Sequence, residues 1–186
     1  MDAWVWVVIA AVVLLGALAF WWSARASRTR ALQGRFGPEY ERTVAGSSNR
    51  SQAEADLRAR QERVEQLDLR PLSRSDHDRF SAEWTKVQAE FVDRPVEAVA
   101  DADRLIQDVM QQRGYPVADF ERRAADLSVE HPSVVENYRS AHSIAVKETR
   151  DDMDDADTEA LRKAMVRYRS LFDELLVVDD SEARRN

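Results

Sequence analysis

Residues 3–22, AWVWVVIAAVVLLGALAFWW, contain no charged side chain and decide how the rest of the chain is interpreted. Ten of these twenty residues are Val, Ile, Leu or Phe. A helix of this length spans about 30 Å, which is the thickness of the hydrocarbon core of a bilayer. Burial of the ten large apolar side chains in lipid favours insertion by roughly 3–6 kcal/mol. The stretch therefore predicts a transmembrane helix, with residues 3–22 in contact with the lipid bilayer.

Tryptophans stand at both ends of this stretch, Trp4 and Trp6 at one end and Trp21 and Trp22 at the other. Indole favours the headgroup level of a membrane, because its ring is apolar while its N–H group needs a hydrogen-bond partner. Two aromatic girdles about one bilayer apart are typical of a membrane-spanning helix.

A cleaved signal peptide is the alternative to a retained anchor, because Ala24-Arg25-Ala26 has the form of a cleavage site. The chain would then be a secreted helical protein. However, no Lys or Arg precedes the apolar run, and the run exceeds the roughly 7–15 residues usual in signal peptides. A buried core helix is also disfavoured, since helices of soluble domains are rarely apolar on every face. We expect a retained anchor.

The charges that flank the stretch predict its orientation. Arg25, Arg28, Arg30 and Arg35 follow it, whereas only Asp2 and the amino terminus precede it. The positive-inside tendency then places the C-terminal domain in the cytoplasm. The same arginines are positioned to contact anionic lipid headgroups, although four are too few to argue lipid specificity.

Composition restricts the function of the remainder. Residues 31–186 carry 24 basic and 33 acidic side chains, and a domain this acidic is repelled by phosphate backbones, so we expect no nucleic-acid partner. The absence of cysteine excludes disulfides, thiol nucleophiles and cysteine metal sites. Five glycines and five prolines among 186 residues favour long helices.

The pattern predicts an all-α fold in four segments. Residues 1–30 form the anchor with a basic juxtamembrane segment, residues 31–72 form connecting charged helices, residues 73–178 form the core of a small multi-helix bundle, and residues 179–186 form a flexible tail. In the second segment, Ser51–Leu67 has only a thin apolar stripe and i,i+4 pairs such as Glu54–Arg58, which indicates a solvated helix.

Capping signals mark the helices of the predicted bundle. Ser73 with Asp76 resembles a capping box, and the helix that follows places Phe80, Trp84, Val87 and Phe91 within about 60° of one another on its circumference. Pro95 opens the next helix, whose apolar positions cover more than half of its circumference, and Gly114 closes it. Asp119 is the predicted N-cap of a helix over 120–127, His131-Pro132 starts another, and a final helix covers 158–178.

The three histidines are weak candidates for chemistry. His77 lies in a charged first turn and is expected to be solvated, and His131 precedes proline, where capping or solvent contact is the default. His142 lies on the apolar face of its helix, one turn after Tyr138, and the competing interpretations are a tuned acid or base and a core histidine. His131 and His142 are three helical turns apart, which is too far to share a metal ion.

The acidic loop over residues 151–157 invites comparison with a calcium site. An EF-hand loop needs oxygen ligands at positions 1, 3 and 5 and glycine at position 6. A loop that starts at Asp152 places Ala156 at position 5, and one that starts at Asp155 places Ala160 where glycine is required. The motif therefore fails. No phosphate-binding loop, nucleophile elbow or zinc motif is present either, so the sequence predicts no catalytic, cofactor-binding or metal-binding residue and disfavours an enzyme.

Several blocks of the chain are familiar as a set. They are Arg35-Phe36-Gly37-Pro38-Glu39-Tyr40, Leu67-Asp68-Leu69-Arg70-Pro71-Leu72, Arg113-Gly114-Tyr115-Pro116, Phe120-Glu121-Arg122-Arg123-Ala124-Ala125-Asp126-Leu127-Ser128-Val129 and His131-Pro132. Together they resemble an uncharacterised family of bacterial single-pass membrane-anchored helical proteins. The resemblance implies a bacterial source and a retained anchor, and it implies no activity, cofactor or partner.

Two functions follow from these patterns. The first is a protein-interaction or structural module, tethered at the cytoplasmic face of a bacterial cell membrane and binding a protein partner through exposed helix faces. The alternative is a small-ligand binder or enzyme with a pocket near Tyr138 and His142, to which Tyr115 and His131 contribute. A filled core with an exposed apolar groove favours the first, and a polar cavity at His142 favours the second.

Overall fold

The structure is a computed structural model that describes the backbone of residues 3–150 and 157–178. Side chains are described in these ranges except at residues 3, 5–12, 19, 24, 149 and 150. The predicted tail, residues 179–186, and the predicted acidic loop up to residue 156 lie outside the described residues.

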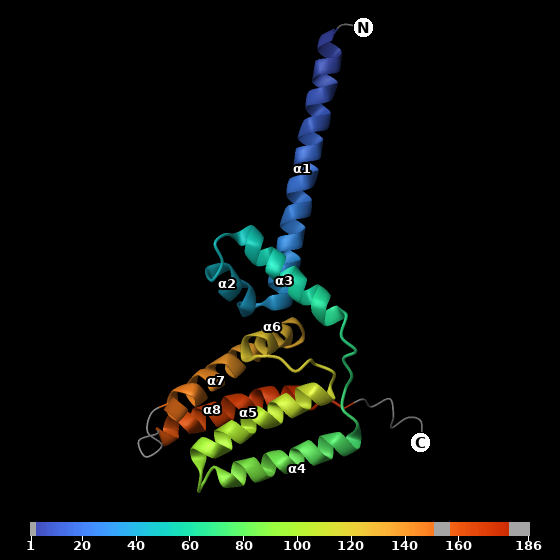
Figure 1. Cartoon of the computed structure of the whole chain (residues 1–186). Helices are drawn as coiled ribbons and strands as arrows, with labels where there is room; N and C mark the ends of the chain where they lie inside the picture. The colour runs from blue at the N-terminus through green and yellow to red at the C-terminus, as the bar shows by residue number, and fades with distance from the viewer. Residues whose placement is uncertain (1–2, 151–156, 179–186) are drawn as a thin grey trace, which may run out of the picture. The chain divides into compact units, whose positions relative to one another are not determined.

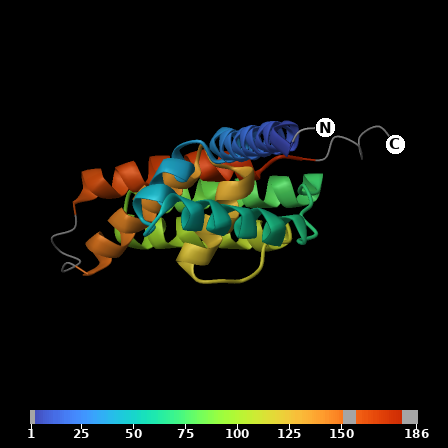
Figure 2. The same ribbon diagram turned by 90° about the horizontal axis from the view of Figure 1, so that it is seen from above.

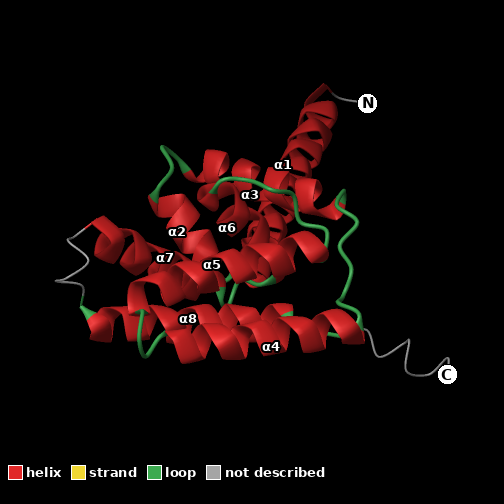
Figure 3. Cartoon of the chain, turned by 60° about the horizontal axis from the view of Figure 1, so that its bottom comes forward, coloured by secondary structure: helices red, strands yellow, loops and turns green. Residues whose placement is uncertain are grey.

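The described residues form an all-α protein, as predicted (Figure 3). The helices are α1 (Ala3–Phe36), α2 (Pro38–Ala45), α3 (Arg50–Glu65), α4 (Arg74–Glu90), α5 (Pro95–Gln112), α6 (Phe120–Glu130), α7 (Val135–Arg150) and α8 (Thr158–Leu175). The β-type pairing found within the described ranges is an isolated bridge between Leu72 and Val178. The described residues form two compact units, one within residues 1–58 and the other within residues 59–186.

The first unit begins with α1, a single continuous helix (Figure 1). Large apolar side chains along it are exposed to solvent, namely those of Trp4, Val13, Leu14, Leu15, Leu18, Phe20, Trp21 and Trp22. Among the side chains that the structure describes, which leave out residues 5–12, no helix contains a segment both long enough and apolar enough to cross a membrane.

Local signals explain how α1, α2 and α3 are separated. Gly37 has a φ of +49°, a conformation that glycine adopts without a steric penalty, and Pro38 begins α2 directly after it. Helix α1 therefore ends at Phe36, six residues beyond the predicted anchor segment. The side chain of Asn49 accepts a hydrogen bond from the backbone N–H of Gln52 at 2.9 Å and so caps the start of α3.

The helices of the second unit begin where the capping signals predict. Ser73 Oγ accepts from the N–H of Asp76 at 3.1 Å and so caps α4 as predicted. The Asp76 carboxylate accepts from the Ser73 hydroxyl at 2.7 Å, and not from the Ser73 backbone N–H that a full capping box uses. Asp119 caps α6 by accepting from the N–H of Arg122 at 2.9 Å. Asp157, which the sequence analysis assigns to the acidic loop, is itself the N-cap of α8.

Helices α4, α5, α7 and α8 lie side by side, with α5 in contact with the other three and α6 against α7 (Figures 1 and 2). Helix α5, whose apolar positions are expected to cover more than half of its circumference, has eight buried residues. The aromatic face of α4 enters the core as predicted, because Phe80 and Trp84 are buried and the Trp84 ring stacks on that of Phe172 at 4.5 Å between centroids. Val87 and Phe91 are partly buried at its margin.

Three expectations need correction. Ala53, Leu57 and Val64 of α3 are buried, so the thin apolar stripe is a packing surface and not the mark of a solvated helix. The final helix ends at Leu175, short of residue 178. The backbone N–H of Leu72 donates a hydrogen bond to the carbonyl of Val177 at 3.2 Å, which holds this segment extended. His131 is the C-cap of α6, and α7 begins only at Val135.

Candidate functional site

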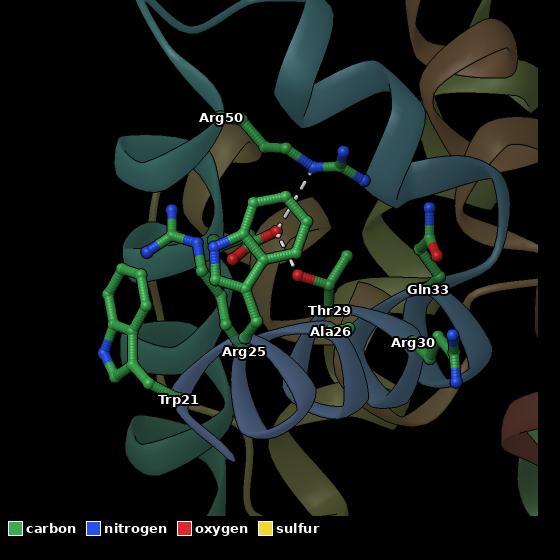
Figure 4. Close-up of a pocket in the computed structure, with 9 residues that line it drawn as sticks. Trp21, Arg25, Ala26, Thr29, Arg30, Gln33 and Arg50 are labelled. Atoms are coloured by element: carbon green, nitrogen blue, oxygen red, sulfur yellow. Dashed lines mark hydrogen bonds and ion pairs between the residues drawn. The ribbon is translucent and has the colours of Figure 1, made fainter. Parts of the chain in front are cut away.

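A polar cluster around Glu54 joins the three helices of the first unit. Glu54 is only 5% exposed, and its Oε1 accepts hydrogen bonds from Thr29 Oγ1 of α1 at 2.9 Å and from Tyr40 Oη of α2 at 3.0 Å. Arg50 Nε, one turn earlier on α3, lies 3.3 Å from the same oxygen. In Figure 4, dashed lines that start at Thr29 and at Arg50 mark these two interactions. One buried carboxylate thus orients groups from α1, α2 and α3.

Arg50 is held from two sides in this cluster. In addition to its ion pair with Glu54, its Nε donates to Tyr40 Oη at 2.8 Å, and its guanidinium carbon lies 5.7 Å from the centre of the Tyr40 ring. Both polar contacts use Nε. The two terminal nitrogens of Arg50 therefore keep their hydrogen-bonding capacity for another acceptor.

The surroundings keep Glu54 ionised. Burial raises the pKa of its carboxyl, but hydrogen bonds from Thr29 and Tyr40 and the positive charges of Arg50 and Arg25 outweigh burial, so the pKa is lowered. Burial raises the pKa of the Tyr40 hydroxyl, which stays protonated as a donor to Glu54. The cluster is therefore a fixed carboxylate, hydroxyl and guanidinium set at neutral pH.

A hollow of about 510 Å³ opens beside this cluster. It is lined by Trp21, Trp22, Arg25, Ala26, Thr29, Arg30 and Gln33 of α1 and by Arg50 and Glu54 of α3. The α1 residues recur every three or four positions, so one face of the helix forms a wall (Figure 4). Three guanidinium groups against one carboxylate give the lining a net positive charge, and Arg25 lies 5.8 Å from the centre of the Trp21 ring.

The predicted histidines fall into different environments. His77 is half-buried and lies 3.1 Å from Asp78, in the charged first turn where solvation is expected. His131 is buried, with Nδ1 3.3 Å from Glu174 Oε1, so the expectation of solvent contact is wrong; the residue occupies the C-cap position of α6. Burial lowers the pKa of the His131 imidazole, although Glu174 opposes the shift.

His142 lies on a second hollow, of about 400 Å³, in the unit formed by residues 59–186. Its ring stacks on that of Phe120 with 3.6 Å between centroids and an angle of 9°. Burial lowers the pKa of this imidazole. The lining consists of Ala100, Asp103, Arg104, His142, Ala145, Val146 and Tyr168.

The other residues of the predicted pocket lie elsewhere. The lining does not include Tyr138, Tyr115 or His131. Tyr138 is buried, and its hydroxyl accepts a hydrogen bond from Arg123 Nε at 3.1 Å. Burial raises the pKa of Tyr138, and also raises the pKa of Tyr115 to about 12. Of the four predicted residues, His142 alone lines this hollow, while Tyr138 lies beside it, with its ring 6.1 Å from that of Tyr168.

Two buried oxygens at this second hollow form no hydrogen bond of good geometry in the described part of the chain, although the Tyr168 hydroxyl interacts with the Asp103 carboxylate. They are Asp103 Oδ1 and Tyr168 Oη. Asp103 Oδ2 accepts from Gln107 Nε2 at 2.6 Å and lies 3.9 Å from a terminal nitrogen of Arg123. Burial, followed by the negative charge of Asp103, raises the pKa of Tyr168. Unsatisfied buried oxygens are costly, and a bound donor would relieve that cost.

Sequence reasoning missed the cluster at Glu54. It assigned Glu54 to a surface pair with Arg58, whereas the structure pairs it with Arg50, Thr29 and Tyr40. No group of three or more His, Asp or Glu side chains within the described residues is arranged to hold a metal ion. Compared with protein-family models, with curated proteins and with solved structures, the chain matches none.

Proposed function

We propose that this protein is a helical interaction module tethered to a membrane by residues 3–22, with its acidic domain at the cytoplasmic face. The observation that carries the proposal is the uncharged twenty-residue run, bounded by tryptophans at each end. Its described side chains expose large apolar area, with Trp4 65%, Phe20 77% and Trp22 74% exposed. Water is a poor solvent for such a surface, and lipid is a good one.

A groove on the second unit supports the interaction role. It measures about 260 Å³ and is lined by Gln88, Phe91, Arg162, Met165, Val166 and Arg169, which belong to α4, α8 and the residue after α4. Val166 is 59% exposed at the groove, and Val92 nearby in sequence is 83% exposed. An apolar floor with cationic edges favours an amphipathic segment of a partner protein.

Tethering is tested by alkaline extraction of membranes that contain the full chain. We expect the wild-type protein in the pellet. Val13→Arg combined with Leu15→Arg places two cations at mid-bilayer, each at about 2.5–3.5 kcal/mol, which cancels the roughly 3–6 kcal/mol of apolar gain and moves the chain to the supernatant. Val117→Arg, at an exposed valine outside the run, is the matched control and stays in the pellet. Extraction of the wild-type chain would refute the proposal.

The interaction role is tested by crosslinking in native membranes. A photoreactive residue at Val166 should capture one protein reproducibly, whereas the same probe at exposed Val117 should not. Equal capture from both positions, or none from either, would contradict a specific groove.

Small-ligand binding is a second candidate, favoured by the hollow at His142 and by the unsatisfied oxygens of Asp103 and Tyr168. A carboxylate oxygen in a mostly apolar hollow suits a small apolar amine. Benzylamine serves as the probe, observed by NMR on the full chain in detergent. Tyr168→Phe should weaken binding severalfold, while Tyr115→Phe, which removes a buried hydroxyl outside the hollow, should not. Identical binding by both variants would exclude this site.

A further inference from the structure

If residues 3–22 span the bilayer, the position of the hollow in the first unit is fixed relative to the membrane surface. This inference rests on that proposed function. Trp21 and Trp22 would then lie at the membrane interface. Arg25 follows Trp22 by about 4.5 Å along the helix, within a headgroup layer roughly 5–8 Å thick. Arg25 is thus brought to the level of the lipid phosphates, while Arg30, about 12 Å beyond Trp22 along the helix, lies at the water-facing end of the hollow.

The lining offers one surface for the phosphate of a lipid and another for the apolar part of the lipid next to the phosphate. Trp21, Trp22 and Ala26 supply an apolar wall, and Arg25, Arg30 and Arg50 supply guanidinium donors. Arg25 and Arg30 form no ion pair within the described residues, and the contacts of Arg50 leave its terminal nitrogens available. Guanidinium groups bind phosphate through paired charge-assisted hydrogen bonds.

Glu54 does not oppose an anion in this hollow. Its Oε1 already accepts from Thr29 and Tyr40 and pairs with Arg50, so the carboxylate fixes the position of the guanidinium instead of competing for a ligand. Against its single charge stand three arginines. A volume of about 510 Å³ lies within the range of about 300–1,000 Å³ that is usual for small-molecule sites.

We infer that this hollow binds the phosphate of an anionic glycerophospholipid headgroup, with Arg25, Arg30 and Arg50 as donors and the two tryptophans against the glycerol and the first part of the acyl chains. It differs from diffuse attraction of basic residues to a charged surface, because α1 and α3 each supply part of one site. Arg28 distinguishes the two cases, since it lies on the same stretch of α1 but does not line the hollow.

The test measures lipid retained by the full chain in detergent, by native mass spectrometry, with phosphatidylglycerol and phosphatidylcholine supplied in equal amounts. We expect phosphatidylglycerol to be retained preferentially. Arg25→Gln removes one phosphate contact and should lower that retention about tenfold, whereas Arg28→Gln, with the same change of charge, should alter it less than twofold. Circular dichroism of both variants should match the wild-type helix content.

Two outcomes would overturn the inference. Equal losses for Arg25→Gln and Arg28→Gln would show that charge alone acts, and equal retention of both lipids by the wild-type chain would show that no headgroup is selected. Soluble glycerol 1-phosphate separates the possible sources of phosphate, because displacement of bound lipid at equal concentration would assign the site to a free phosphate ester.

A separate experiment distinguishes failure of the proposed membrane anchor from failure of the headgroup site. Flotation of the wild-type chain with pure phosphatidylcholine vesicles tests the anchor without an anionic lipid. A chain that floats but binds phosphatidylglycerol identically in both arginine variants retains its anchor and loses only the headgroup site. A chain that does not float loses both.

Discussion

Replacement of Gly114 by alanine should destabilise the second unit strongly. Gly114 follows α5 with a φ of +99°, which L-residues rarely adopt. A Cβ built at this position would lie 2.4 Å from the carbonyl oxygen of Asp68, which is backbone and cannot rotate away. The two segments are also joined directly, because the N–H of Arg70 donates to the carbonyl of Arg113 at 2.9 Å.

The magnitude follows from these two effects. The strained conformation costs about 1–3 kcal/mol, and the displacement of packed backbone costs about another 1–3 kcal/mol. A loss of about 3–4 kcal/mol is a large fraction of the 5–15 kcal/mol typical of a domain, and it should lower the melting temperature by roughly 10–15 °C.

Thermal unfolding of the full chain in detergent, followed by circular dichroism, measures this effect. Gly34→Ala is the control for the same chemical change, because Gly34 has no heavy atom within 4 Å of its Cβ position and no positive φ, and it should not lower the melting temperature. A Gly114→Ala protein that melts within 2 °C of wild type would refute the argument for a close approach.

Three further changes probe the second unit. The half-buried Arg63 guanidinium contacts the Asp126 carboxylate at 2.8 and 2.9 Å, and Asp126→Ala leaves it without this partner. The substitution should lower the free energy of unfolding in urea by about 2–3 kcal/mol, and a loss below about 0.5 kcal/mol would contradict a structural ion pair. Ser73→Ala removes the cap of α4 and should cost about 1 kcal/mol, whereas no loss would contradict the capping role of Ser73. Burial lowers the pKa of His131 in the folded protein, so the unfolded chain binds more protons and the free energy of unfolding should fall as pH drops below 6.5. His131→Gln should reduce the dependence of the unfolding free energy on pH between pH 7.5 and 5.5. An unchanged dependence would assign it to other groups.

Sequence reasoning succeeded where the determining signal is local. Ser73, Pro95 and Asp119 mark the starts of α4, α5 and α6, because capping and proline geometry act within one helical turn. The periodicity that places Phe80 and Trp84 in the core is also contained within a single helix.

It failed where the signal depends on tertiary contacts. Glu54 meets Thr29 and Tyr40 across 25 and 14 positions of sequence, and nothing in the charged pattern of α3 distinguishes this carboxylate from its solvated neighbours. The same limit applies to His131, whose burial against Glu174 spans 43 positions. Patterns of residues give helix faces but not the partner that each face meets.

The central claim is that residues 3–22 stay attached and remain in lipid. The most direct measurement is the intact mass of the protein recovered from alkali-washed membranes of cells that express the full chain. We predict an unprocessed chain of about 21.3 kDa in the membrane fraction. A shortened chain that begins at Ser27, found in the aqueous fraction, would contradict the account.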